Sequence, residues 1–240
     1  MNRIIAVFGA LALMAVTTYI FLDRGYVRLN YPDSEKYPVR GIDVSHHQDV
    51  IDWQLLTREG LSFAFIKATE GGDHKDTKFI HNWEMADKAG LVRGAYHFFT
   101  FCKTGREQAM NFIETVPVTK HMLPPVIDLE FGGNCSARPT REQVHAEIEE
   151  FARLIRAEYG MDPIIYATSQ SYEDFLEGGE YDYPLWIRNI YRTPYLGDGR
   201  KWDFWQYANR GRLLGIKGFV DLNVFNGTAD DFELFVASGG

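Results

Sequence analysis

The chain has 240 residues, of which 45% are hydrophobic and 24% are charged, as is typical of a folded domain with one sizeable core. Its formal net charge is −8 and its basic residues form no stripe, so we expect no nucleic-acid partner. An acidic chain is not drawn to anionic lipid either, so any membrane contact has to come from apolar sequence.

Such a sequence stands at the start of the chain. The run from Ile4 to Leu22 contains no charged residue, and as a helix it would be about 28 Å long, close to the roughly 30 Å of a bilayer core. A cleaved signal peptide is the alternative, but Thr17, Thr18 and Tyr19 stand where a small-residue cleavage site should lie. We therefore expect residues 1–23 to form a transmembrane anchor or signal segment. Either places the remainder outside the cytoplasm, in the periplasm or outside the cell.

Residues 24–39 are polar, contain Pro32 and Pro38 and lack periodicity, which predicts a linker. From residue 40 to residue 240, short apolar runs alternate with amphipathic segments, which is typical of an α/β domain with a mainly parallel sheet. The predicted strands are Gly41–Val44, Phe63–Lys67, Val92–Phe98, Pro125–Leu129, Pro163–Ala167, Leu185–Arg188, Phe204–Tyr207 and Gly218–Leu222.

Three helices are marked in the sequence. Capping boxes start two of them, at Thr104 and at Thr140, and an apolar stripe from Phe79 to Ala86 predicts the third. Helix signals fade after about residue 180. Eight strands with incomplete helical linkage predict an irregular TIM-like β/α barrel with fewer helices than strands.

Functional side chains in such barrels gather at the C-terminal ends of the strands. Polar or aromatic residues stand at these positions in every predicted strand, namely Asp43, Lys67, Glu70, Tyr96, His97, Asp128, Glu130, Tyr166, Trp186, Arg188, Gln206 and Asp221. Several carboxyl groups at one mouth make each other harder to ionise, so stability alone does not explain them. We therefore predict a functional site at this mouth.

The sharpest local feature is the pair Asp128 and Glu130, which follows an apolar run. Residues two apart in a strand point to the same side, with Cα atoms about 6.6 Å apart. Two such acids can divide the work of glycoside hydrolysis, which needs a proton donor and a group that stabilises positive charge. One acid could instead pair with Lys67 or Arg188 for structural reasons, and the pair alone leaves both interpretations open.

A wider set of motifs narrows the choice. In chain order these are Gly41-Ile42-Asp43-Val44-Ser45-His46-His47-Gln48, Ile66-Lys67-Ala68-Thr69-Glu70-Gly71, Gly94-Ala95-Tyr96-His97-Phe98, Asp128-Leu129-Glu130, Leu185-Trp186-Ile187, Trp205-Gln206-Tyr207 and Val220-Asp221-Leu222-Asn223. Together they resemble glycoside hydrolase family 25, the lysozymes that act as N-acetylmuramidases, over about Arg40 to Val236.

The resemblance implies an enzyme that cleaves peptidoglycan at the β-1,4 bond from N-acetylmuramic acid to N-acetylglucosamine, with retention and without a cofactor. By motif position, Glu130 resembles the general acid/base. Asp128 resembles a carboxylate that is either the nucleophile or the orienter of the substrate's acetamido group. We favour the second role, because adjacent acids on one face suit opposite sides of a sugar poorly. Asp43 and Asp221 resemble supporting carboxylates.

Further residues are expected to bind the sugar. These are Tyr96, Tyr166, Trp186, Gln206 and Glu70, and Trp205 is a further groove candidate. Arg188 departs from the family pattern, which leads us to expect a small residue there. It could meet an anionic lactyl or peptide carboxylate of the substrate, or merely neutralise a nearby acid.

The remaining expectations concern pairing and partners. In an exported chain, Cys102 and Cys135 are expected to form a disulfide. His46 and His47 point apart if they end a strand, so we predict hydrogen-bonding roles for them and no metal site. We expect a monomer whose partners are peptidoglycan strands and, through the N-terminal segment, a membrane. A non-catalytic glycan-binding module on the same scaffold is the alternative function.

Overall fold

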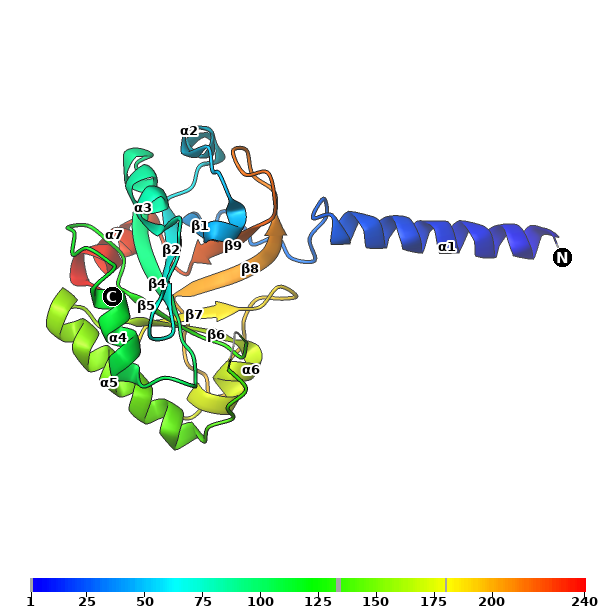
Figure 1. The fold of residues 1–240 in the computed structure, drawn as a ribbon. Coiled ribbons are helices and arrows are strands. Elements are labelled where there is room, and N and C mark those ends of the chain that lie inside the picture. Colours follow the sequence, from blue (N-terminus) through cyan, green and yellow to red (C-terminus); the bar gives the residue numbers. More distant parts are fainter. Residues whose placement is uncertain (1, 133–134, 180) are drawn as a thin grey trace.

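The computed structural model describes residues 2–132, 135–179 and 181–240, and Figure 1 shows a β-barrel with helices packed around it. The strand order is β1-β9-β8-β7-β6-β5-β4-β2, and β1 also pairs with β2, which closes the barrel. The strands are β1 (Arg40–Val44), β2 (Phe63–Glu70), β3 (His74–Lys75), β4 (Val92–Phe98), β5 (Val126–Leu129), β6 (Ile164–Thr168), β7 (Leu185–Arg188), β8 (Phe204–Gly211) and β9 (Val220–Phe225). The predicted α/β barrel is confirmed.

The direction of one strand, β9, differs from the prediction. We expected Asp221 at the C-terminal end of a strand over Gly218–Leu222, but β9 starts at Val220 and lies antiparallel to both β1 and β8. Its connection to β8 spans only residues 212–219, which is too short for the crossover that a parallel strand needs. The N-terminal end of β9 therefore reaches the barrel mouth, and Asp221 lies opposite Asp43 in the β1–β9 register.

Aromatic side chains fill the barrel below its mouth. Phe65 stacks on Trp186 with ring centroids 4.4 Å apart, and Phe63 and Phe204 pack edge to face beside them. Gly94 leaves room for this core, because a Cβ atom there would lie 2.6 Å from the Phe65 ring. A packed interior of this kind holds the strand ends above it in fixed positions.

Helices cover the outside of the barrel and its lower end. They are α2 (Trp53–Leu56), α3 (Phe79–Lys88), α4 (Gly105–Ile113), α5 (Arg141–Tyr159), α6 (Ser169–Ser171) and α7 (Ala229–Ser238), with short helical turns η1 (His46–Gln48), η2 (Thr57–Glu59) and η3 (Tyr172–Leu176); α1 (Asn2–Asp23) stands apart from them. The capping boxes at Thr104 and Thr140 are confirmed as the starts of α4 and α5.

Helix α7 was not predicted. Thr228 caps it and forms a capping box with Asp231, whereas the usual capping-box pattern has Glu or Gln at this position. Phe232 and Val236 on this helix are buried in the same cluster as the barrel interior, so α7 closes that cluster.

Helix α1 extends away from the barrel (Figure 1). A membrane-spanning helix needs about 20 consecutive, predominantly apolar residues. Over the described part of the chain, no helix combines the length and the apolar character that crossing a membrane requires. The predicted transmembrane anchor, and with it the membrane as a partner, is not supported.

The disulfide prediction is confirmed. Cys102, in the loop after β4, is bonded to Cys135, in the segment after β5, with Cα atoms 5.7 Å apart. The bridge therefore ties together the segments that follow two neighbouring barrel strands.

Candidate active site

A cavity of about 410 Å³ opens at the barrel mouth, within the size range of small-ligand sites. Strand ends from every side of the barrel line it, through Asp43, Ser45, His47, Lys67, Tyr96, Phe98, Asp128, Glu130, Tyr166, Trp186, Arg188, Gln206, Asn209 and Asp221. Every residue that the sequence predicts for catalysis or sugar binding is in this set, except Glu70 and the groove candidate Trp205. Asp128 and Glu130 line it together, as the alternation along the strand predicts.

Asp43 is the centre of a hydrogen-bond network in the cavity wall. Its Oδ2 atom accepts hydrogen bonds from Gln206 Nε2 at 2.9 Å and from Asn223 Nδ2 at 2.8 Å. Gln206 Oε1 accepts a bond from the Tyr166 hydroxyl at 3.1 Å, and Asn223 Oδ1 accepts one from Trp186 Nε1 at 2.9 Å. Because each amide is held at both ends, β1, β6, β7, β8 and β9 fix the position of this carboxylate together.

The carboxyl groups of Asp43 and Asp221, which are paired in the β1–β9 register, influence each other's ionisation. Burial raises the pKa of both carboxyl groups. The hydrogen bond between them raises the pKa of Asp221 further and lowers that of Asp43, which the two amide donors also lower. The arrangement therefore favours a protonated Asp221 that donates to an ionised Asp43.

Asp128 and Glu130 are the second acid pair. Burial raises the pKa of Asp128 well above its ordinary value, and the charge of Glu130 raises it further. Burial also raises the pKa of Glu130, while Arg188 opposes that shift. Asp128 is only 8% exposed, and its Oδ1 atom has no hydrogen-bond partner among the described residues, whereas Glu130 is half-buried at the rim. A buried acceptor without a partner is available for a ligand.

The comparisons with known proteins agree with this geometry. The model of the glycosyl hydrolases family 25 matches residues 42–216, which is most of the chain. The chain belongs to glycosyl hydrolase family 25.

Individual relatives span the same region. A solved family 25 glycosyl hydrolase from Bacillus anthracis is 41% identical to this hydrolase, with a TM-score of 0.82 over 87% of this chain and 97% of that one. The protein YegX of Escherichia coli K12 is 39% identical, over 83% of this chain and 74% of its own length. Lysozyme M1 of Streptomyces globisporus is 36% identical, over 80% of this chain and 69% of its own length. This chain is thus a glycoside hydrolase.

The structure gives Glu70 of this family 25 hydrolase a different place from the one expected. Glu70 does not line the cavity, and its Oε2 atom accepts a hydrogen bond from Lys67 Nζ at 2.8 Å. Lys67 also lies 4.9 Å above the Phe98 ring, and its charge lowers the pKa of both Asp128 and Glu130. Glu70 therefore holds the cation that balances the acid pair, and the cavity gives no support to a direct sugar contact.

The aromatic residues of the hydrolase differ in what they can reach. Tyr96 is half-buried at the rim, while Tyr166 and Trp186 are 5% and 2% exposed and form the floor of the cavity. The expectation of a groove position for Trp205 is wrong. Trp205 is the neighbour of Gln206 on β8, so its side chain points to the outside of the barrel, where Nε1 donates to the Asn189 carbonyl oxygen.

Asn223 and Asn209 belong to the hydrolase's site, although no role there was predicted for them. Asn223 lies two positions after Asp221 on β9, so the alternation along the strand could have revealed it. Asn209 lines the cavity because the register of β8 shifts between Gln206 and Ala208, which no sequence pattern announces.

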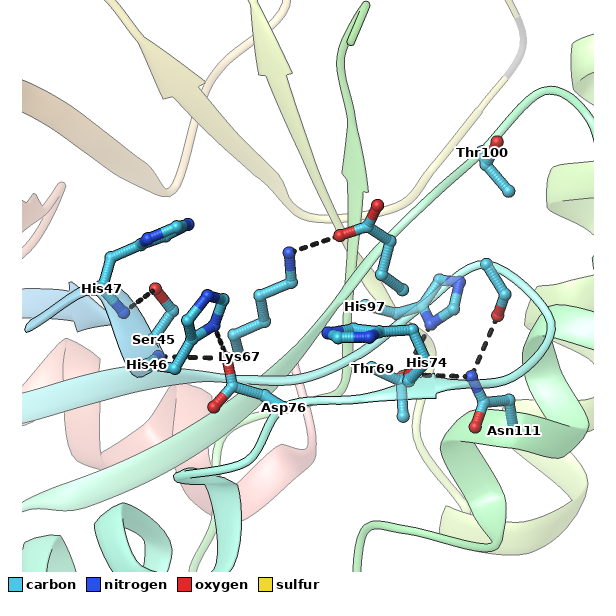
Figure 2. Close-up of polar contacts among 12 residues, drawn as sticks. Ser45, His46, His47, Lys67, Thr69, His74, Asp76, His97, Thr100 and Asn111 are labelled. Carbon is cyan, nitrogen blue, oxygen red and sulfur yellow. Dashed lines mark hydrogen bonds and ion pairs between the residues drawn. The ribbon is translucent and has the colours of Figure 1, made fainter. Parts of the chain in front are cut away.

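The histidines hold the loops around the mouth. Figure 2 shows His46 directed at Asp76, whose Oδ2 atom lies 2.7 Å from His46 Nδ1. His97 is fully buried between Thr69 and Gln108, and this burial lowers its pKa to about 4. In the described ranges, no group of three or more His, Cys, Asp or Glu side chains is arranged to hold a metal ion.

Proposed function

We propose that this family 25 hydrolase is a lysozyme that cleaves peptidoglycan at the β-1,4 bond from N-acetylmuramic acid to N-acetylglucosamine, with retention. The observation that carries the proposal is the pair Asp128 and Glu130 at the end of β5. Both side chains line the same cavity, and burial raises the pKa of both carboxyl groups. Lysozyme M1, which is 36% identical over 80% of this chain, supports this class of substrate.

Glu130 is the general acid/base in this proposal. It is the more exposed member of the pair, and it lines both the mouth cavity and the larger cavity beside it. A glycosidic oxygen that bridges two sugars therefore reaches Glu130 more readily than the buried Asp128. The raised pKa of Glu130 favours the protonated form that a general acid needs.

Asp128 orients the substrate. Its partnerless Oδ1 atom can accept a hydrogen bond from the acetamido N–H of the muramic residue. Such a bond stabilises the Asp128 carboxylate, and the proton that the acid pair shares then resides on Glu130. The acetamido oxygen attacks the anomeric carbon as Glu130 protonates the leaving oxygen. Water, deprotonated by Glu130, later opens this intermediate from the opposite face, and the two inversions give retention.

Asp43 and Asp221 support this reaction from the other side of the barrel. The amide donors of Asp43 favour its ionised form, which would place negative charge where positive charge develops on the sugar. Its charge also raises the pKa of Glu130, which helps Glu130 to keep its proton. Tyr96, Tyr166, Trp186 and Gln206 form the sugar-binding walls and floor.

The test uses the purified protein and purified peptidoglycan. The release of reducing ends is measured, the reducing sugar is identified by mass after borohydride reduction, and the first anomer formed is followed by NMR. New reducing ends on muramic acid with the β anomer first are expected. Glu130→Gln should lower the rate at least about 100-fold, as expected for loss of a general acid. Glu233→Gln, an exposed position on α7, is the matched control.

Three outcomes would contradict the proposal in different ways. Full activity of Glu130→Gln would remove Glu130 from its role, and an α anomer as first product would refute retention. Binding of peptidoglycan without cleavage would select the glycan-binding module instead. Strands whose muramic residues lack the acetyl group should be cleaved far more slowly, and equal rates would refute acetamido participation.

The place of action follows from the proposed substrate. Peptidoglycan lies outside the cytoplasmic membrane, so the proposal requires a periplasmic or extracellular enzyme. The disulfide between Cys102 and Cys135 suits such an oxidising location. The chemistry proposed here uses only side chains of one chain and the substrate, so it needs neither a cofactor nor a second subunit.

A further inference from the structure

A second cavity adjoins the mouth cavity. Its volume is about 760 Å³, and it shares Glu130 and Arg188 with the first. The loop after β7 contributes half of its other lining residues, including Asn189, Tyr191 and Arg192. The proposed acid therefore stands on the border between two compartments that a single ligand can occupy together.

The two compartments differ in charge. The mouth cavity is lined by the carboxyl groups of Asp43, Asp128, Glu130 and Asp221. In the second cavity, Glu130 is the sole acidic lining residue, and it is accompanied by Arg188 and Arg192. One compartment thus suits an uncharged sugar that becomes positive during reaction, and the other suits an anionic group.

Both arginines are available for a ligand. In a protein of net charge −8, neither Arg188 nor Arg192 has a carboxylate within ion-pair distance among the residues that the structure describes. The loop that carries Arg192 is also held in place. The side-chain oxygen of Asn189 accepts hydrogen bonds from the backbone N–H groups of Tyr191 and Arg192, both at 3.1 Å, and the Asn189 carbonyl accepts Trp205 Nε1 at 2.8 Å.

We propose that the second cavity binds the anionic peptide that the muramic residue carries, with Arg188 and Arg192 contacting its carboxylates. This inference rests on the function proposed above. Only one of the two sugars at the scissile bond bears a peptide, through its lactyl ether, so the peptide begins close to the bond that Glu130 protonates. Arginine presents a planar fork that matches a carboxylate.

The two arginines have separable roles. Arg188 lies between the compartments, and its charge lowers the pKa of Asp43, Glu130 and Asp221. A substitution there changes the acids as well as the anion site. Arg192 is exposed, is absent from the mouth cavity and is not a cause of these shifts, so it is the position at which peptide recognition is tested.

The experiment compares two forms of the same glycan strands. One form carries stem peptides with free carboxylates, and in the other these carboxylates are converted to amides, which leaves the sugars unchanged. The wild-type protein should prefer the free acids about fivefold in kcat/KM, as expected for exposed charge pairs. Arg192→Gln should reduce the preference to roughly twofold, because Arg188 remains, and Arg192→Glu should abolish or reverse it. Arg58→Gln, an exposed arginine on η2, should retain the wild-type ratio.

The possible failures are distinguishable. A wild-type protein that cleaves neither form refutes the proposed lysozyme function itself. Cleavage of both forms at equal rates leaves that function standing and overturns peptide recognition. A full preference in Arg192→Glu and Arg192→Gln, with wild-type melting temperatures, overturns it as well. The preference should also weaken as salt is raised, because exposed charge pairs are screened.

Discussion

Removal of the bridge between Cys102 and Cys135 should destabilise the protein by an amount that follows from its place in the chain. The bridged residues are 33 positions apart. A loop of that length loses about 12.5 cal/mol/K of unfolded-state entropy when it is closed, which corresponds to about 3.7 kcal/mol at 25 °C. For a protein of this size, that loss lowers the melting temperature by roughly 8–15 °C.

The measurement is thermal unfolding followed by circular dichroism. The oxidised wild type, the reduced wild type and the double variant Cys102→Ala/Cys135→Ala are compared at one pH. Cys102 is exposed, so a reductant reaches the bridge in the folded protein. The reduced wild type and the double variant should melt together, well below the oxidised protein. The single variant Cys102→Ala should match them, because either substitution breaks the same bond.

A double variant that melts within about 2 °C of the oxidised wild type would contradict this stabilisation by the bridge. Such a result would mean that the unfolded chain already confines this loop, or that the native bridge opposes the barrel geometry. Activity well below the melting transition adds a second readout. The bridge holds the segment that follows Glu130, so loss of kcat at full folding would indicate that it also positions this acid.

Three further predictions concern the barrel. Because the pKa of Glu130 is raised in the folded state, the wild type loses stability as pH rises above the ordinary value of 4.5. Glu130→Gln should therefore be about 1 kcal/mol more stable than the wild type at pH 7. Urea titrations should show this gain shrinking toward pH 4. The pH dependence due to His97 has the opposite direction, since its pKa falls from 6.5 to about 4 on folding. The free energy of unfolding should drop by on the order of 3 kcal/mol as pH falls through that interval. An NMR titration midpoint near 6.5 would contradict its burial as the neutral form. Gly94→Ala should lower the free energy of unfolding by about 1–3 kcal/mol, because the added Cβ would lie 2.6 Å from Phe65. Gly218→Ala, with no atom within 4 Å of the added Cβ, should change it by less than about 0.5 kcal/mol. Equal effects of the two substitutions in urea unfolding would refute a steric clash at Gly94.

The sequence was most informative where local rules determine direction. Alternation along β5 predicts that Asp128 and Glu130 share a face, and the strand-end rule brings Asp43 to the same mouth. Capping boxes with Glu or Gln at the fourth position likewise predict where α4 and α5 begin. These features depend on neighbours in the chain, so a pattern of a few residues suffices.

Features that depend on distant segments could not be predicted. The direction of β9 depends on which strands it joins, and Asn209 faces the cavity because of a register shift in β8. Trp205 is a different case, because Gln206 was already expected in the site and alternation along β8 turns its neighbour Trp205 to the outside of the barrel. Glu70 is drawn to Lys67, and no spacing rule distinguishes that ion pair from a ligand contact.

The barrel closes where the first strand, β1, pairs with the last strand, β9, and this closure bears on when the site is assembled. Asp43 receives one of its two amide donors from Asn223, 180 positions further along the chain, and β1 lies between β2 and β9. During synthesis, β1 is made first, and the Asn223 donor to its Asp43 carboxylate is present only after β9 has been made. A chain without β9 would still contain Asp128 and Glu130, but it would lack Asp221 and the Asn223 amide that donates to Asp43. Completion of the hydrogen-bond network around Asp43 therefore requires the chain to extend through β9.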